Sequence, residues 1–157
     1  MIEIREITIQ NINEFWDLHI QYLTETGMIY DQDELSFFSG RTYRSLLEEH
    51  MVRKEDKQHM AYFYRNNERI GAVSYCTYQS EDGKCFILDY WIFPEFRGNG
   101  VGHQCFEALT KHTKSDGALY YELNSIKEDS IRFWKSLGFV ENGKDKYGIL
   151  LLIKKNC

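Results

Sequence analysis

Three closely spaced glycines form the segment of this sequence that is best suited to chemistry. They lie in Arg97-Gly98-Asn99-Gly100-Val101-Gly102, after the apolar run of residues 86–93 and before a pattern that is typical of a helix. Glycine lacks a Cβ atom, so its backbone can approach a ligand closely and present several N–H groups in one direction. At the start of a helix, those N–H groups have no intrahelical partners and lie at the positive end of the helix dipole. The segment therefore predicts an anion site, to which Arg97 would add a fixed cation.

Two phosphate-binding motifs do not fit these glycines. The phosphate loop of nucleotide hydrolases requires Lys and then Ser or Thr after its last glycine, but this chain has His103 and Gln104 there. The dinucleotide motif G-x-G-x-x-G does not fit, because the three glycines alternate with other residues. A tight turn without a ligand is the alternative interpretation of the segment.

The histidines and cysteines offer no familiar metal-binding or nucleophilic pattern. The five histidines show neither H-E-x-x-H nor Cys/His spacing, so the sequence predicts no metal. Cys105 falls on the apolar face of the helix after the glycines and is expected in the core. The cysteines form no C-x-x-C pair, and charged residues stand where a signal peptide would be apolar, which favours a reducing cytoplasm. No window is apolar enough for a membrane helix, so we expect a soluble protein.

Length and charge narrow the classes of protein further. A chain of 157 residues predicts a single domain, residues 1–157, with its own core. Aromatic residues make up 15% of the chain and there is one proline, so no disordered or low-complexity segment is expected. The net charge of -5 argues against nucleic acid as a partner. The acidic segment of residues 30–35 is either a solvated surface or a surface that attracts cationic acceptors electrostatically.

Hydrophobic periodicity predicts the elements that position the glycines. β-branched residues near the N-terminus predict a strand that ends near Ile9. Three- and four-residue spacings predict an amphipathic helix over residues 11–27 and a less regular helix over residues 34–52. Three strands follow, with a hairpin turn at Asn66-Asn67-Glu68 and another turn before residues 84–93.

The second half of the chain alternates strands and helices. The helix after the glycines ends at residues 115–117, and residues 118–125 predict a strand. A helix follows, with Asp129 as N-cap and Gly138 at the C′ position, before two final strands. The expected order is β-α-α-β-β-β-α-β-α-β-β. The strand, helix and strand around the glycines introduce parallel neighbours into an otherwise antiparallel sheet, which defines a mixed α/β fold with flanking helices.

With these elements in place, the sequence resembles the GNAT superfamily of acyl-CoA-dependent N-acetyltransferases. Residues 97–102 match the complete Arg/Gln-x-x-Gly-x-Gly/Ala signature that follows the fourth strand in that superfamily. The segment IFPEFRGNGVG looks like its common V-x-P-x-Y/F-R-G-x-G-I/V-G form, and SIRFWKSLGF looks like its A-x-x-F-Y-x-x-x-G-F segment. The order of elements agrees over nearly the whole chain. The resemblance therefore implies a GNAT-like fold and acetyl-CoA as co-substrate.

The resemblance also implies which residues bind the cofactor. Main-chain N–H groups of the glycine segment would hold the pyrophosphate of acetyl-CoA, from Gly98, Asn99, Gly100, Val101 and Gly102, beside Arg97. Ile92 and Phe93 would pair their backbone with the pantetheine arm. The fourth and fifth strands would diverge, with the thioester between them.

The implied reaction is direct attack of an amine on the thioester carbonyl, without a covalent enzyme intermediate. Proximity and a polarising backbone N–H would supply part of the rate. An alkylamine has a pKa of about 10.4, so it must lose a proton before it attacks. Asp89, where many family members carry an acidic residue, and Glu122 on the fifth strand are the candidate bases. Asp89 would act directly or order a water, or else serve only a structural hydrogen bond.

Two residues depart from the family pattern. Trp134 stands where the family commonly places the tyrosine that protonates the departing thiolate, and an indole N–H is no useful acid. Activity survives without that acid, or Tyr121 or Tyr147 replaces it. Lys127 stands where an asparagine often contacts pantetheine, and it either pairs with a CoA phosphate or faces solvent. We count Lys127 and Trp134 among the candidate cofactor-binding residues.

The acceptor groove implied by the resemblance lies between the first helices and strands four and five. It would be lined by Trp16, His19, Tyr22, Tyr30, Asp31, Asp33 and Glu34. Aromatic and acidic side chains suit an amine cation, although Trp16 and Tyr22 are also expected in the core. We expect a small cationic amine; the alternatives are a non-catalytic acyl-CoA sensor and a protein or peptide acetyltransferase. No membrane partner is expected. The resemblance alone implies a homodimer. The apolar residues 148–155 would pair either with a strand of their own sheet or with a strand of another subunit.

Overall fold

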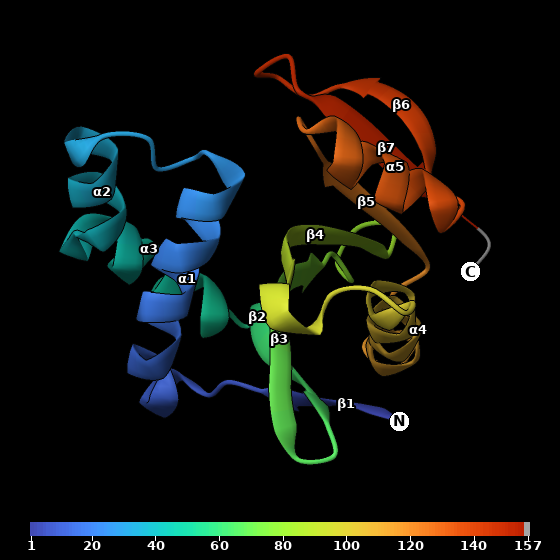
Figure 1. Cartoon of the computed structure of the whole chain (residues 1–157), viewed down its shortest axis with the longest axis horizontal. Helices are drawn as coiled ribbons and strands as arrows, with labels where there is room; N and C mark the ends of the chain where they lie inside the picture. The colour runs from blue at the N-terminus through green and yellow to red at the C-terminus, as the bar shows by residue number, and fades with distance from the viewer. Residues whose placement is uncertain (156–157) are drawn as a thin grey trace.

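The computed structural model describes residues 1–155 as a seven-stranded sheet with helices on both faces (Figure 1). The strands are β1 (Ile2–Glu6), β2 (Gln58–Arg65), β3 (Glu68–Thr77), β4 (Lys84–Ile92), β5 (Tyr120–Asn124), β6 (Val140–Lys144) and β7 (Leu150–Lys154). The helices are α1 (Asn13–Thr26), α2 (Gln32–Ser39), α3 (Arg41–Met51), α4 (Val101–Lys114) and α5 (Glu128–Ser136), with short 3-10 turns η1 (Ile9–Asn11) and η2 (Pro94–Phe96). The sheet order is β1-β2-β3-β4-β5-β7-β6, and neighbouring strands are antiparallel except β4 and β5. The predicted mixed α/β fold is confirmed, and the apolar strand β7 pairs within its own sheet.

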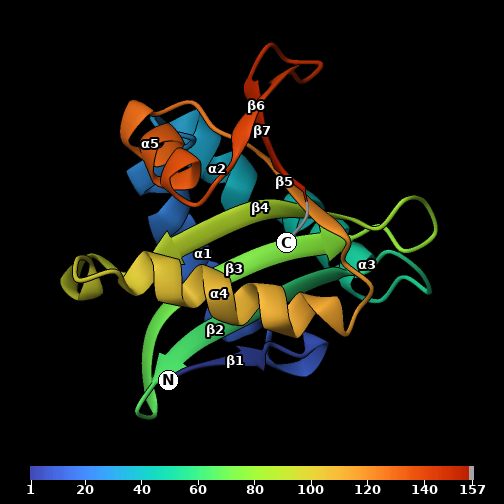
Figure 2. The ribbon, with the colours of Figure 1, turned by 90° about the vertical axis from the view of Figure 1, so that its right-hand side faces the viewer.

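Alternating side chains divide the core between the two faces of the sheet. In β2, Ala61 and Phe63 belong to one cluster with α4 and α5, whereas Met60 and Tyr62 belong to another with α1 and α3. This is the two-residue period of a strand that is buried on both faces. Figures 1 and 2 show the same division, with α1, α2 and α3 on one side of the sheet and α4 on the other.

Most predicted elements are present, with three local differences. The second expected helix is divided into α2 and α3 at Gly40, whose backbone is extended with φ -81° and ψ 160°. The prediction of Asp129 as an N-cap was wrong, because α5 begins at Glu128, two residues earlier than that cap implies, and Lys127 occupies the N-cap position. The hairpin turn between β2 and β3 contains only Asn66 and Asn67, both with positive φ, as a tight two-residue hairpin turn requires.

Strand β4 contains one residue more than the neighbouring strand can pair. Tyr75 of β3 lies opposite Ile87, but the preceding residue, Ser74, lies opposite Asp89. Leu88 is therefore the additional residue of a β-bulge, which shifts the inward and outward alternation of the strand by one position.

The bulge decides which face of the sheet Asp89 joins. Before it, Cys85 and Ile87 pack in the cluster under α4, and after it Tyr90 and Ile92 do so. The inward positions thus change from odd to even numbers. Without the extra residue, Asp89 would point into the apolar core under α4; with it, Asp89 points toward α1.

Strands β4 and β5 separate just before the bulge. They pair only where Lys84, Cys85 and Phe86 lie opposite Tyr120, Tyr121 and Glu122. Beyond that point β5 remains paired with β7 on its other side, so the second half of β4 has an open edge. This is the divergence that the family resemblance implies.

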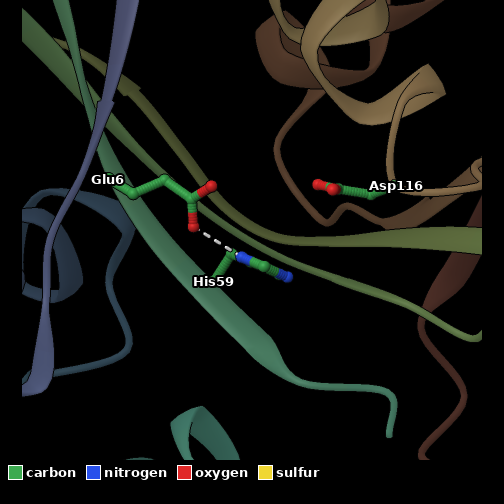
Figure 3. Close-up of side chains that lie close together, drawn as sticks. All are labelled: Glu6, His59 and Asp116. Atoms are coloured by element: carbon green, nitrogen blue, oxygen red, sulfur yellow. Dashed lines mark hydrogen bonds and ion pairs between the residues drawn. The ribbon is translucent and has the colours of Figure 1, made fainter.

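A polar cluster joins β1 and β2 to the far end of α4. The two carboxylate oxygens of Glu6 lie 2.6 Å from Nδ1 of His59 and 3.1 Å from Nε2 of His112. Asp116 points toward the same region, and atoms of Glu6, His59 and Asp116 that can bind a metal lie within 4.8 Å of one another (Figure 3). Because both oxygens of Glu6 already contact imidazoles, we interpret the cluster as an ion-pair network. The absence of a metal stays a prediction.

Within residues 1–155, no helix combines the length and the apolar character that a bilayer span needs. Cys76, Cys85 and Cys105 are buried free thiols. Cys105 lies in the core cluster under α4, as predicted. Cys157 lies outside the described residues.

Candidate active site

The glycine loop keeps its backbone in the left-handed region over three consecutive residues. The φ angle is 98° at Gly98, 55° at Asn99 and 76° at Gly100. Glycine adopts these angles without steric cost, and asparagine tolerates them better than most residues. A Cβ atom at Gly98 or Gly100 would meet no atom within 4 Å, so the backbone angle, and not a lack of room, requires glycine there.

This conformation leaves a row of main-chain N–H groups without acceptors. The N–H of Val101 donates to the carbonyl of Gly98 at 3.2 Å, and that of Gln104 donates to the carbonyl of Gly100 at 3.0 Å. Among residues 1–155, no protein acceptor serves the N–H groups of Asn99, Gly100, Gly102 and His103. They lie at the N-terminal end of α4, where the helix dipole favours negative charge. The loop can therefore bind an anion that offers several acceptor oxygens.

Gly102 serves a different purpose from the other two glycines. A Cβ atom at Gly102 would lie 2.7 Å from Cε1 of Phe133, so the missing side chain lets α4 pack closely on α5. The ring of His103 contacts Phe133 edge-on with centroids 5.6 Å apart, and its Nε2 lies 2.9 Å from the hydroxyl of Ser136. Helix α5 thus supports the first turn of α4 directly.

A hollow of about 450 Å³, here called the loop cavity, runs from the glycine loop along the end of β4. Its described lining consists of Tyr90, Trp91, Ile92, Arg97, Gly98, Gly100, Val101, Gly102, His103 and Phe133. Most of the residues predicted to bind the cofactor therefore share one cavity. A larger hollow of about 550 Å³ lies between β1 and α4, but neither the three glycines nor Asp89 line it.

Arg97 is tied to the protein on two sides. Its Nε donates to the carbonyl of Ile92 at 2.8 Å, and its terminal nitrogen lies 2.6 Å from a carboxylate oxygen of Glu25. The other oxygen of Glu25 accepts from the indole N–H of Trp91. Glu25, near the end of α1, thus links α1, β4 and the glycine loop. The Arg97 side chain is still 45% exposed, so an anion in the loop cavity can reach it.

Two further residues that were expected to contact the cofactor have partners within the protein. The N–H of Phe93 donates to the carbonyl of Ile70 in β3 at 2.9 Å, so by strand alternation Ile92, and not Phe93, turns toward the open edge of β4. The ammonium group of Lys127 donates to the main-chain carbonyl of Glu25 at 2.8 Å, which joins the turn before α5 to α1.

Trp134 is a core residue. It is 4% exposed and packs against the rings of Tyr90, Phe106 and Phe139. Its neighbour Phe133 is the α5 side chain that lines the loop cavity. Successive helical residues are about 100° apart around the axis, which is why one ring enters the core and the next faces the glycines.

Neither tyrosine considered as a replacement acid reaches the loop cavity. The hydroxyl of Tyr121 lies 2.6 Å from Oγ1 of Thr113, in the core under α4. Tyr147 is 76% exposed in the turn between β6 and β7.

A second hollow, of about 240 Å³, lies where β4 and β5 diverge and is here called the splay cleft. Its described lining consists of Tyr22, Leu23, Thr26, Met28, Leu88, Asp89, Asn124, Ser125, Ile126, Lys127, Ser130 and Ile149. Apolar side chains form much of this wall. Asp89 contributes the carboxyl group and Lys127 the ammonium group.

Asp89 is a largely buried carboxyl group in the wall of the splay cleft. Its side chain is 20% exposed, and burial raises its pKa to about 7, because a charged carboxylate loses hydration there. A carboxyl with such a pKa changes protonation state close to neutral pH. That is the property of an effective general base.

His19 of α1 lies next to Asp89. Its Nδ1 is 3.5 Å from Oδ2 of Asp89, and its Nε2 is 2.7 Å from the hydroxyl of Tyr43 in α3. Burial, assisted by the charge of Arg44, lowers the pKa of His19 to about 4, so the ring is neutral. The helical spacing of α1 indicates that His19 and Tyr22 share the groove side. No local signal marks Tyr43, because α3 meets α1 only in the folded chain.

The other predicted site residues lie elsewhere. Glu122 is 8% exposed, and its carboxylate contacts Nζ of Lys84 at 3.5 Å and Nδ2 of Asn142 at 3.1 Å. Among the described residues it is not part of the lining of the splay cleft. Trp16 is 4% exposed in the core with α3, in agreement with the expected core role.

The acidic segment after α1 is also separate from the cleft. Asp31 accepts a hydrogen bond from the N–H of Glu34 and caps α2. Four predicted acceptor residues do not belong to the described lining of the splay cleft, namely Tyr30, Asp31, Asp33 and Glu34. The capping role of Asp31 therefore accounts for part of the segment's acidity.

Comparison with known families bears directly on this site. The model of the acetyltransferase (GNAT) family matches residues 13–139. The chain belongs to this family. The match begins at α1 and ends just after α5, so it includes Asp89 and the whole glycine loop. As a GNAT acetyltransferase, the protein uses acetyl-CoA as co-substrate.

Solved GNAT structures share this fold at low sequence identity. PaiA N-acetyltransferase from Thermoplasma acidophilum, crystallised with coenzyme A, has a TM-score of 0.73 and 18% identity over 99% of both chains. The Salmonella typhimurium acetyltransferase that modifies the N-terminal serine of ribosomal protein L7/L12 has a TM-score of 0.66 and 16% identity over 99% of this chain and 95% of its own.

An aminoglycoside acetyltransferase from an uncultured soil metagenomic sample is similar too, with a TM-score of 0.64 and 12% identity over 90% of this chain and 93% of its own. No curated protein sequence gives a significant match. At these identities the structures show the fold alone. Since these GNAT acetyltransferases act on different kinds of acceptor, the acceptor must be argued from the splay cleft itself.

Proposed function

We propose that residues 1–157 form a single N-acetyltransferase domain that moves the acetyl group of acetyl-CoA to a small primary amine. One observation carries the proposal: consecutive residues of β4 line both hollows. Tyr90, Trp91 and Ile92 line the loop cavity, while Leu88 and Asp89 line the splay cleft. A single strand therefore connects the row of free N–H groups to a carboxyl that titrates near neutral pH.

The free N–H groups at the start of α4 would hold the pyrophosphate of acetyl-CoA. The oxygens of a diphosphate match a row of donors at a helix N-terminus, and Arg97 adds a positive charge beside them. From there the pantetheine arm would follow the open edge of β4 past Ile92. This path brings the thioester to the divergence of β4 and β5.

Asp89 would be the general base for the acceptor. As a carboxylate, it takes one proton from the ammonium group directly or through a water, and the neutral amine then attacks the thioester carbonyl. A nitrogen–carbon bond forms and the carbon–sulfur bond breaks, while the second proton of the amine passes to the departing sulfur, directly or through water, so that CoA leaves as the thiol. Main-chain N–H groups on the unpaired edge of β4 can polarise the carbonyl. Tyr22, whose pKa is raised by burial and by Asp89, stays protonated and can donate to the sulfur.

The lining of the splay cleft supports an acceptor with one positive charge and an apolar body. Asp89 is the carboxylate of the described lining, and side chains such as Met28, Leu88 and Ile126 form its apolar wall. A polyamine or aminoglycoside would bring additional ammonium groups that this wall does not pair. A monoamine such as phenethylamine fits the balance of charge and apolar surface better.

Thiol release from acetyl-CoA, measured with monoamines, polyamines, aminoglycosides, amino acids and peptides, tests this proposal. We expect Asp89→Asn to lower kcat on the best amine by about 100-fold or more while calorimetric CoA affinity is kept. Gly100→Trp, which fills the space before the free N–H groups, should abolish CoA binding. Full activity of the Asp89 variant would contradict the assigned base. Turnover confined to polycations or peptides would contradict the assigned acceptor.

A further inference from the structure

His19 is a buried polar side chain with one unsatisfied nitrogen. It is 3% exposed, and its Nε2 lies 2.7 Å from the hydroxyl of Tyr43. Within the described part of the chain, Nδ1 has no hydrogen-bond partner. An unpaired buried polar atom costs free energy, so its retention in an otherwise apolar layer requires an explanation.

The imidazole is held in one orientation by aromatic neighbours. Phe15 stacks on one side with centroids 5.1 Å apart and an angle of 26°, and Tyr43 is nearly parallel at 5.8 Å and 6°. Trp16 contacts the ring edge-on at 6.3 Å. Nδ1 is thereby kept facing Oδ2 of Asp89, 3.5 Å away, which is just beyond a good hydrogen bond. A small rotation of the carboxylate would close it.

The charge of Asp89 and the hydroxyl of Tyr43 together select a tautomer. A neutral imidazole has one N–H and one lone pair. If the Tyr43 hydroxyl donates to Nε2, the ring proton is on Nδ1 and faces the ionised carboxylate, which is attractive. The other tautomer would direct a lone pair of the ring at the carboxylate, which is repulsive.

We propose that His19 is a positioning residue, fixed by Tyr43 as the Nδ1–H tautomer, that donates to ionised Asp89 and so sets the pH at which this base works. The inference rests on the proposed function of Asp89. It assigns to a residue of α1 the control of a group on β4, which neither the glycine motif nor the family match specifies.

Among residues 1–155, neither of the two nearby phenols donates a hydrogen bond to Asp89. From α1, Tyr22 lines the same cleft as a neutral phenol, and from α3 Tyr43 is likewise neutral. Arg44 of α3 acts on His19, stacked over Trp16 at 5.1 Å. Lys127 lines the cleft, but its ammonium group donates to the carbonyl of Glu25. Among the described residues, His19 is thus the buried imidazole whose unsatisfied nitrogen faces the carboxylate.

Two substitutions of His19 distinguish the roles of its two ring nitrogens. In His19→Asn, the amide can occupy the place of Nδ1 and keep the hydrogen bond to Asp89. In His19→Gln, the longer side chain places its amide nearer Nε2, so the contact with Tyr43 is kept and the contact with Asp89 is lost. Tyr43→Phe removes the hydroxyl group that selects the tautomer of His19, while it leaves the imidazole in place.

The direct readout is the pKa of Asp89, titrated by carbon-13 NMR of its carboxyl in the full-length protein. We expect His19→Asn to match the wild type and His19→Gln to raise the pKa of Asp89 by about one unit, with a smaller rise for Tyr43→Phe. The acid limb of thiol release from acetyl-CoA with phenethylamine should shift by the same amount.

The outcomes separate the two proposals. If the pKa of Asp89 is equal in the wild type, His19→Gln and Tyr43→Phe, His19 does not act as inferred, whatever the activity. If the wild type binds acetyl-CoA but releases no thiol with any amine, the proposed function fails, while the NMR titration still decides the role of His19. If His19→Gln does not fold, Tyr43→Phe and His19→Asn provide the same comparison.

Discussion

Asp89 combines a buried position with a charge that the proposed reaction needs. Its carboxyl lies among apolar side chains of α1 and β4, and burial raises its pKa to about 7. A carboxyl in water has a pKa of about 3.9, so above that pH the folded state must either hold a proton or bury a charge. The proposed catalytic function therefore costs stability at neutral and alkaline pH.

We predict that Asp89→Asn stabilises the protein above neutral pH. The pKa of Asp89 is higher in the folded state, so its stabilising protonated form is fully present below the unfolded pKa and lost as pH rises through about 7. The gain for the variant should grow between pH 4 and pH 7 and level off at about 4 kcal/mol by pH 8, because the pKa differs by about three units between the two states. Urea denaturation at several pH values measures it, with exposed Glu68→Gln as the matched carboxylate control. A gain that does not vary with pH would contradict the predicted burial effect.

At the scale of elements, the contact between α4 and α5 keeps the glycine loop in place. Gly102 permits this contact, because any Cβ atom there would overlap the ring of Phe133. The same ring lines the loop cavity, so packing and proposed cofactor binding share one side chain.

Gly102→Leu should therefore weaken both properties. We expect a loss of about 1–3 kcal/mol in the free energy of unfolding, because the added side chain overpacks the interface. CoA binding should weaken as well, because Phe133 must move into the loop cavity. The double variant Gly102→Leu with Phe133→Ala should recover much of the stability. Calorimetry of unfolding and of CoA binding would check both effects, and the absence of any recovery would show that Phe133 is not the obstacle.

Across the whole molecule, the Glu6 cluster joins segments that are remote in sequence. Glu6 of β1 contacts His59 of β2 and His112 of α4, and the pairs are 53 and 106 residues apart. The hydrogen bond to His59 lowers the pKa of Glu6, and the same bond raises the pKa of His59. The two shifts define a pH window for the contact.

We predict that the cost of His59→Gln is greatest between about pH 4.5 and pH 6.5. The contribution of Glu6 is present above its unfolded pKa and lost as pH falls through its lowered folded value. The contribution of His59 is present below its unfolded pKa and lost as pH rises through its raised folded value. The Glu6 side chain is 40% exposed, so solvent limits the effect to less than about 1 kcal/mol.

Thermal unfolding of the wild type and His59→Gln from pH 3.5 to pH 9 provides the measurement. His50→Gln is the matched control, because His50 pairs with Gln58 and has no carboxylate partner among residues 1–155. A cost that is equal at all pH values would mean that packing of the ring, and not its charge, is what the substitution removes.

The sequence alone determined those features that depend on neighbouring residues. The helical spacing, the Asn-Asn hairpin and the strand before the glycines were confirmed, since each is governed by local backbone preference and by burial along one element. Gly98 and Gly100 were recognisable for the same reason, because closely spaced glycines before a helical pattern indicate positive φ angles at the start of the helix. The family and its co-substrate followed from the glycine motif together with the segment SIRFWKSLGF and the order of elements.

The tertiary structure alone decided which side chains meet in the site. The single extra residue Leu88 changes the face of Asp89, and no residue near Leu88 in sequence reveals a mismatch that exists only against β3. Tyr43, His19 and Asp89 come from α3, α1 and β4, and only sheet and helix packing brings their polar atoms together. Motif position favoured Trp134 and Phe93, but helix rotation buried the indole and sheet pairing occupied the amide. Local preference fixes an element's type, whereas the direction of a side chain depends on register and rotation, which distant partners set.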